Sequence, residues 1–207
     1  MLILPPYDLL QQQAMTQAVV AAVKEVEQRP KTPGHVQILQ GLAPHAPQSI
    51  DNAVDEVKSA SAFWDSGIHK GWKDRTDLAV LVACFSDHPL TGMIRHTFPK
   101  STVLNILEAG VIKALAAGQK FGIVTTTEDF VDEFKRAVGN IIGQNNDRFV
   151  GTFATGYTAI QLKTGSQNEI AKRLQVAAET LLRKGATVII LGCSGELWRL
   201  PVCCASF

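Results

Sequence analysis

The sequence has no surplus of charge of either sign. It holds 20 lysine and arginine residues against 19 aspartate and glutamate residues, a formal net charge of +1, and it contains no basic run. Proteins that bind nucleic acid or an anionic membrane surface by electrostatic attraction present a basic patch. The balanced charge argues against both partners, and we expect a small-molecule substrate instead.

Long apolar runs are also missing. The apolar stretches, such as residues 187–191, are far shorter than a membrane-spanning helix, which needs roughly 20 residues. The first residues, Met-Leu-Ile-Leu-Pro-Pro, lack the basic flank and the apolar length of a signal peptide. These features predict a soluble, cytoplasmic protein without a membrane partner.

Cysteine is scarce, and histidine shows no ligand spacing. Four cysteines in 207 residues do not make a disulfide framework, and Cys203 and Cys204 are neighbours that cannot sensibly bridge each other. This cysteine usage fits a reducing compartment. The five histidines, at positions 35, 45, 69, 88 and 96, lack the spacing of a metal site, so we expect no metal.

Strand-like and helix-like segments alternate along the chain. Strands that alternate with helices of about 10–17 residues predict βαβ units and parallel sheets. We therefore expect an α/β fold with two lobes, residues 1–100 and 101–207. The expected strands are residues 2–4, 35–40, 78–83, 120–125, 148–155 and 187–191, and the expected helices are residues 11–28, 49 or 51 to 62, 89–97, 102–117, 128–142 and 168–184.

Two cysteines occupy matching places in this pattern. Cys84 closes the apolar run of residues 78–83, Cys193 closes the run of residues 187–192, and each opens a small polar turn. A strand that is apolar on both faces belongs inside a parallel sheet, and its carboxyl end opens into the crevice where α/β proteins bind ligands. A lone cysteine on an apolar strand is usually structural. The matched pair favours two thiols that face one substrate.

Five segments carry a wider resemblance: Val80-Leu-Val-Ala-Cys-Phe-Ser-Asp, Asn105-Ile-Leu-Glu-Ala-Gly, Phe121-Gly-Ile-Val-Thr-Thr, Val150-Gly-Thr-Phe-Ala-Thr-Gly, and Val188-Ile-Ile-Leu-Gly-Cys-Ser-Gly. Their order and spacing, over roughly residues 14–195, resemble the Asp/Glu/hydantoin racemase family, and most of all its fungal hydantoin-racemase-like members. The resemblance implies two pseudo-symmetric lobes, each a mostly parallel sheet flanked by helices, with the active site in the cleft between them. It also implies a homo-oligomer and no cofactor.

The resemblance further implies that Cys84 and Cys193 are the catalytic acid/base pair. Racemising a carbon without a cofactor needs a base on one face and an acid on the other. A free cysteine has a pKa of about 8.5, and backbone N–H groups near Ser194 and Gly195 would stabilise a thiolate and the enolate oxygen of the substrate. Hydantoins or related cyclic ureides suit this reaction because the ring acidifies the α-proton.

The sequence allows two interpretations of several residues. Thr125, Thr126 and Thr127 bind a carboxylate or ring oxygen of the substrate, or they cap the helix that starts at Glu128. Ser86, with the aspartate after it, orients the loop of the first thiol or belongs to an ordinary turn. Glu108 supports the junction between the lobes or is merely internal to a helix. The same scaffold also suits an isomerase or decarboxylase that acts through an enolate, or a catalytically impaired or non-enzymatic relative.

Both ends of the chain depart from the family pattern. Leu4-Pro-Pro-Tyr-Asp-Leu stands where the family has a loop like Asn-Pro-Asn-Thr, and residues 196–207 stand where the family continues with a helix, a returning strand and a final helix. The sequence therefore predicts a weakened substrate cradle, an uncovered sheet edge and reduced activity.

Overall fold

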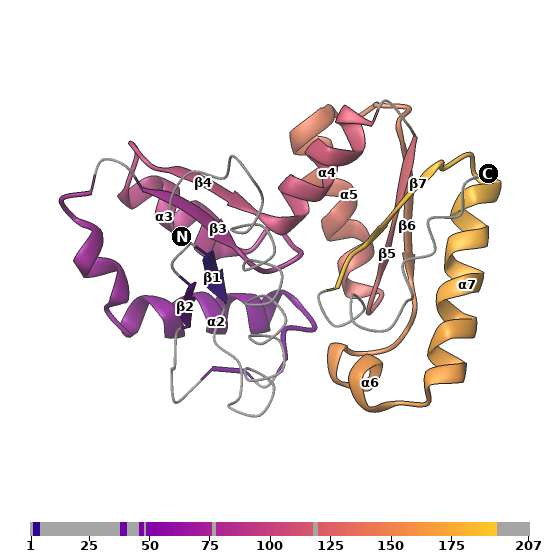
Figure 1. The fold of residues 1–207 in the computed structure, drawn as a ribbon, viewed down its shortest axis with the longest axis horizontal. Coiled ribbons are helices and arrows are strands. Elements are labelled where there is room, and N and C mark those ends of the chain that lie inside the picture. Colours follow the sequence, from indigo (N-terminus) through magenta and orange to yellow (C-terminus); the bar gives the residue numbers. More distant parts are fainter. Residues whose placement is uncertain are drawn as a thin grey trace, which may run out of the picture. The chain divides into compact units, whose positions relative to one another are not determined.

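The computed structural model describes residues 2–4, 38–40, 46–47, 49–75, 78–117 and 120–193. The chain forms two compact units, Met1–Ala109 and Gly110–Phe207, and each contains its own sheet (Figure 1). All strand pairs of the described residues are parallel, which confirms the predicted α/β class. The helix expected over residues 11–28 lies outside the described residues.

The first unit is built on a four-stranded sheet in the order β2-β1-β3-β4. Three aromatic rings of this unit pack against one another at tilted angles. The ring centroid of Trp72 lies 6.1 Å from that of Phe63 and 5.7 Å from that of Phe98. The strands are β1 (Leu2–Leu4), β2 (Ile38–Gln40), β3 (Ala79–Val82) and β4 (Thr102–Asn105), and the helices are α2 (Ala53–Asp65), the 3-10 helix η1 (Ile68–Trp72) and α3 (Pro89–Thr97).

The start of α2 differs from the expected one. The helix begins after Asn52, whose side-chain oxygen accepts hydrogen bonds from the backbone N–H groups of Val54 at 2.9 Å and Asp55 at 3.1 Å. We expected Ser49 or Asp51 to cap this helix. Asparagine is an equally strong capping residue, and it stands directly before the helical segment, so it takes the position.

The helix expected over residues 102–117 is wrong at its beginning. Thr102–Asn105 forms β4, which pairs in parallel with β3, and the helix α4 (Ile106–Ala116) starts only afterwards. A reciprocal cap fixes this boundary: the N–H of Glu108 donates to Oδ1 of Asn105 at 2.8 Å, and the N–H of Asn105 donates to Oε2 of Glu108 at 3.1 Å. The units divide after Ala109, inside α4.

The second unit is built on a three-stranded sheet in the order β6-β5-β7, with α5 on one face and α7 on the other (Figure 1). Its strands are β5 (Phe121–Thr125), β6 (Phe149–Ala154) and β7 (Val188–Leu191), and its helices are α5 (Asp129–Ile142), α6 (Ala159–Thr164) and α7 (Gln167–Arg183). The expected strands and long helices of this half are confirmed to within two residues at each end. The sequence did not predict the short helix α6, which begins with a capping box between Thr158 and Gln161.

One hydrophobic cluster of this unit lies between the sheet and α7. Gly122 allows the close approach, because a Cβ at this position would lie only 2.9 Å from both Cδ atoms of the buried Leu181. The buried members of the cluster are Val124, Leu162, Ile170, Leu174, Ala177, Leu181 and Ala186. Nowhere in the described residues is a helix long and apolar enough to cross a membrane.

Candidate active site

The first thiol lies just beyond a strand end. β3 ends at Val82, and Cys84 follows with only 8 % of its surface exposed. Its Sγ atom lies 3.3 Å from Oγ of Ser86, which is fully buried. A hydroxyl that donates to sulfur favours the thiolate form, because hydrogen bonding to a charged group stabilises that group. The structure thus places Ser86 directly against the first thiol.

The loop after Cys84 is anchored by a buried histidine. His88 is the N-cap of α3, and its Nδ1 atom accepts from the N–H of Leu90 at 3.3 Å. Burial lowers the pKa of His88 to about 4, so the imidazole is neutral and carries its proton on Nε2. Sequence reasoning gave His88 no role, although its place directly before Pro89 at a helix start was visible.

Glu108 is held by groups of the first unit. Besides its reciprocal cap with Asn105, its carboxylate accepts two hydrogen bonds from Nη2 of Arg95, at 2.7 and 2.9 Å. The same Arg95 nitrogen donates to the backbone oxygen of Val103 at 2.6 Å. These contacts tie α3, β4 and the start of α4 together, so Glu108 fixes a helix start.

The second unit places two of the predicted threonines at the end of β5. Thr125 is fully buried, and its hydroxyl has no hydrogen-bond partner. Thr125 therefore does not cap α5, whose N-cap residue is Glu128; the side chain of Glu128 makes no capping hydrogen bond either. Thr126, the next residue, is also buried. The hydroxyl of Thr125 remains available for a ligand oxygen or a water.

Thr155 holds the loops after β5 and β6 together. Its hydroxyl donates to the backbone oxygens of Thr125 at 3.0 Å and Thr126 at 3.1 Å. The N–H groups of Thr155 and Gly156 donate to the same two oxygens at 2.8 Å. Sequence reasoning missed Thr155. The available signal was the Thr-Gly pair at the end of the strand pattern of residues 148–155.

The second thiol emerges at the same sheet edge as these threonines. β7 ends at Leu191, and the N–H of Gly192 donates to the backbone oxygen of Val124 at 2.7 Å, which keeps β7 beside β5 up to the strand ends. Cys193 follows, half-buried, and packs with Tyr157 against the core cluster under α7. The predicted site residues Ser194 and Gly195 lie outside the described residues.

Each unit thus gathers part of the predicted site. Cys84 and Ser86 are in contact in the first unit, and Cys193 lies at one edge with Thr125 and Thr126 in the second. Both thiols follow strands of parallel sheets, the place where α/β proteins position reacting groups. A thiol in such a place can accept or donate a proton. Among the described residues, no group of three or more His, Cys, Asp or Glu side chains is arranged to hold a metal ion.

Comparison with known proteins gives related chains and related folds. An uncharacterized protein of Schizosaccharomyces pombe is 31% identical over 168 residues, which cover 79% of this chain and 68% of the relative. An allantoin racemase from Klebsiella pneumoniae superposes with a TM-score of 0.70 at 23% identity, over 94% of this chain and 73% of that one. An allantoin racemase from Pseudomonas fluorescens gives a TM-score of 0.67 at 21% identity, over 94% of this chain and 77% of that one.

The family comparison covers most of the chain. The family model described as Asp/Glu/Hydantoin racemase matches residues 12–196. The match contains both strands that lead to the thiols and every predicted site residue. The chain belongs to the Asp/Glu/hydantoin racemase family.

Proposed function

We propose that this chain racemises a cyclic ureide such as allantoin, with Cys84 and Cys193 as the acid/base pair on opposite faces of the chiral carbon. One observation carries the proposal: the two thiols have equivalent places, each two residues past the end of a parallel strand, in the two units of a racemase-family chain. The arrangement supports a reaction that needs two similar groups rather than one nucleophile.

The reaction needs only the two sulfur atoms for its proton transfers. The thiolate takes the proton from the chiral carbon, and the electron pair of the broken C–H bond moves onto the neighbouring carbonyl oxygen to form an enolate. The other thiol then gives its proton to the opposite face of the carbon as the carbonyl re-forms. The sulfur that began as thiol ends as thiolate, which readies the protein for the opposite enantiomer.

The neighbouring hydroxyls support this scheme. Ser86 contacts the sulfur of Cys84 at 3.3 Å, so its hydroxyl can stabilise the thiolate before proton transfer. In the second unit, the unpartnered hydroxyl of Thr125 is a candidate donor for the enolate oxygen. We assign substrate-binding roles to Ser86, Thr125 and Thr126 on this basis, together with Ser194 and Gly195.

The cyclic ureide is favoured for a chemical reason. In allantoin the chiral carbon lies between a ring carbonyl and two nitrogens, so the carbanion formed there is delocalised and its proton is acidic without a cofactor. Two solved structures with a related fold are allantoin racemases, which makes allantoin the first substrate to test.

The decisive experiment follows one enantiomer of allantoin in D₂O with purified protein, by optical rotation and by NMR of the α-proton. We expect both signals to decay above the rate without protein, and the opposite enantiomer to carry deuterium. Cys84→Ser and Cys193→Ser should each abolish racemisation. The remaining thiol should still exchange the α-proton of one enantiomer, and that enantiomer should differ between the two variants.

Cys203→Ser is the matched control, since it removes a thiol that is not assigned to the site and should leave the rate unchanged. Full racemisation by either Cys84→Ser or Cys193→Ser would rule out the two-base scheme. Loss of activity in all three variants would point to a general effect of the substitution on the protein.

A further inference from the structure

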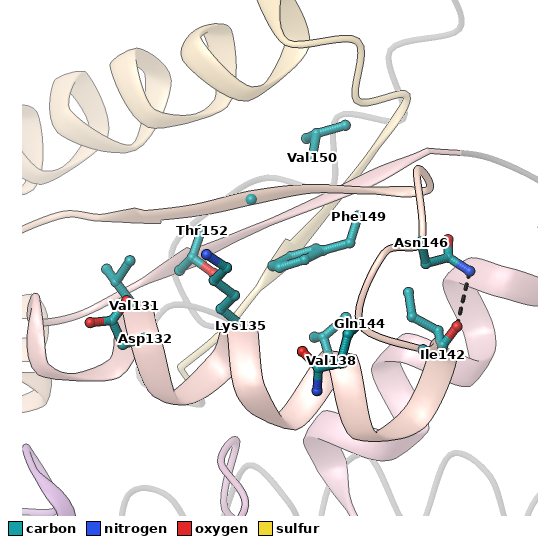
Figure 2. Close-up of a pocket in the computed structure, with 13 residues that line it drawn as sticks. Val131, Asp132, Lys135, Val138, Ile142, Gln144, Asn146, Phe149, Val150 and Thr152 are labelled. Carbon is teal, nitrogen blue, oxygen red and sulfur yellow. Dashed lines mark hydrogen bonds between the residues drawn. The ribbon is translucent and has the colours of Figure 1, made fainter.

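The second unit contains a pocket between α5 and β6. Its volume is about 430 Å³, within the range of small-molecule sites. Figure 2 shows side chains from the helix, the strand and the loop between them converging on this space. Neither Cys84 nor Cys193 lines it. The lining residues that matter here are Asp132, Lys135, Val138, Gln144, Phe149 and Thr152.

A β-bulge shapes the strand side of the pocket. Phe121 of β5 pairs with Phe149 of β6, but the next residue, Gly122, pairs with Gly151, so Val150 is an extra residue in β6. Gly151 adopts a φ of 126°, which favours glycine. Bulges of this kind re-aim the side chains that follow them.

The bulge determines which side chains of β6 line the pocket. Phe121 and Ile123 lie on one face of β5, and their partners Phe149 and Thr152 therefore lie on one face of β6. In a strand without a bulge, alternation would place these two side chains, which are three positions apart, on opposite faces. Instead, both face α5 and line the pocket (Figure 2).

The polar groups of the pocket include an unused hydroxyl. Oγ1 of Thr152 is buried and has no hydrogen-bond partner. Lys135 extends from α5 toward Thr152 (Figure 2), and its ammonium group brings a positive charge to the same place. An ammonium beside a free hydroxyl is suited to a carboxylate, since both can donate hydrogen bonds to its oxygens.

A second charge and an apolar wall narrow the ligand class. Asp132 lines the pocket one helical turn before Lys135, so it disfavours a second negative charge and can accept from an ammonium group. Val138 and Phe149 give the pocket an apolar wall. The amide of Gln144 adds a further polar group at the helix end.

Gly139 of α5 makes room for this amide. A Cβ at Gly139 would lie 2.6 Å from both amide atoms of Gln144, so a larger residue here would push the exposed Gln144 side chain away from the helix. Taken together, the pocket presents the ammonium group of Lys135, the carboxylate of Asp132, the hydroxyl of Thr152 and an apolar surface.

We propose that this pocket binds a free α-amino acid with an apolar side chain. The carboxylate contacts Lys135 and Thr152, the ammonium group points toward Asp132, and the side chain packs on Val138 and Phe149. Because the charged groups are exposed, each adds little affinity, and a dissociation constant of about 1 mM is expected for a ligand of this size. The proposal does not depend on the racemase reaction.

The test is an NMR titration of the ¹⁵N-labelled full chain with L-leucine. We expect saturable shifts of backbone amides in residues 131–152, with a dissociation constant of about 1 mM. Thr152→Val and Lys135→Met should each weaken binding about fivefold or more, in line with one lost polar contact of about 1 kcal/mol. Lys172→Met is the matched control, because Lys172 is an exposed lysine on α7, and it should bind like the unchanged chain.

Two ligand analogues test the two charges separately. Leucinamide lacks the carboxylate and should not produce the saturable shifts, while 4-methylpentanoate lacks the ammonium group and should bind more weakly than leucine. Asp132→Asn should weaken leucine binding but not 4-methylpentanoate binding. The proposal is overturned if leucine shifts no amide of the pocket, if Thr152→Val and Lys135→Met bind normally while their spectra show a folded chain, or if 4-methylpentanoate binds as tightly as leucine.

Discussion

Acid should destabilise the first unit through His88. This imidazole is 1 % exposed, and burial lowers its pKa from 6.5 to about 4. The unfolded chain therefore takes up a proton at a higher pH than the folded chain does. Stability from this group is complete above pH 6.5 and is lost as the pH falls toward 4. Proton linkage gives a loss of about 2 kcal/mol at pH 5 and about 3 kcal/mol at pH 4, relative to pH 8.

The assay is urea unfolding followed by tryptophan fluorescence between pH 8 and pH 5. His88→Asn keeps a capping oxygen at the start of α3 but removes the titrating group. The free energy of unfolding of this variant, minus that of the unchanged chain, should therefore rise by about 2 kcal/mol between pH 8 and pH 5. Taking the difference cancels the titration of all other groups.

His96→Asn is the control for this measurement. His96 is exposed near the other end of the same helix, and its replacement should leave the acid limb of the stability profile as it is in the unchanged chain. A difference between His88→Asn and the unchanged chain that stays constant from pH 8 to pH 5 would refute the reasoning, because it would mean that the imidazole of His88 is not held neutral by burial.

Three further substitutions test the packing. Gly122→Ala should lower the free energy of unfolding by about 1–3 kcal/mol because its Cβ meets Leu181 at 2.9 Å. Gly92→Ala on α3 is the control and should not lower it, since the added Cβ meets nothing within 4 Å. Equal melting temperatures of the two variants would contradict the predicted clash at Gly122. Asn52→Ala should cost about 1 kcal/mol in urea unfolding, and Asn52→Asp should restore most of it. Thr155→Val should cost about 1 kcal/mol and lower the racemisation rate of allantoin; a rate equal to that of the unchanged chain would exclude a role for this loop contact in positioning the site.

The strands that lead to the thiols were predictable because their patterns are local. Both runs are short, apolar and end at a small polar turn, so β3 and β7 follow from the sequence. β4 was not predictable in this way. Thr102–Asn105 is only four residues long and runs directly into the apolar helix α4, so the strand and the helix resemble a single helical segment in the sequence.

The contacts that position the site groups depend on distant segments. The hydroxyl of Thr155 donates to backbone oxygens about 30 residues earlier in the chain. No local sequence pattern indicates a hydrogen bond of this kind. Ser86 is the opposite case, since it lies two residues from the thiol that it contacts. The contact between Ser86 and Cys84 was therefore within reach of sequence reasoning, and the long-range contacts of Thr155 were not.

The extra residue in β6 also provides a marker for relatives. Removing Val150 would leave only Gly151 between Phe149 and Thr152, so a regular strand would still place both side chains on the face toward α5. A family member that lacks a residue at this position could therefore keep the strand side of the pocket without a bulge. A relative that keeps the extra residue needs the bulge, and with it a glycine at the position of Gly151, to bring the two side chains to one face.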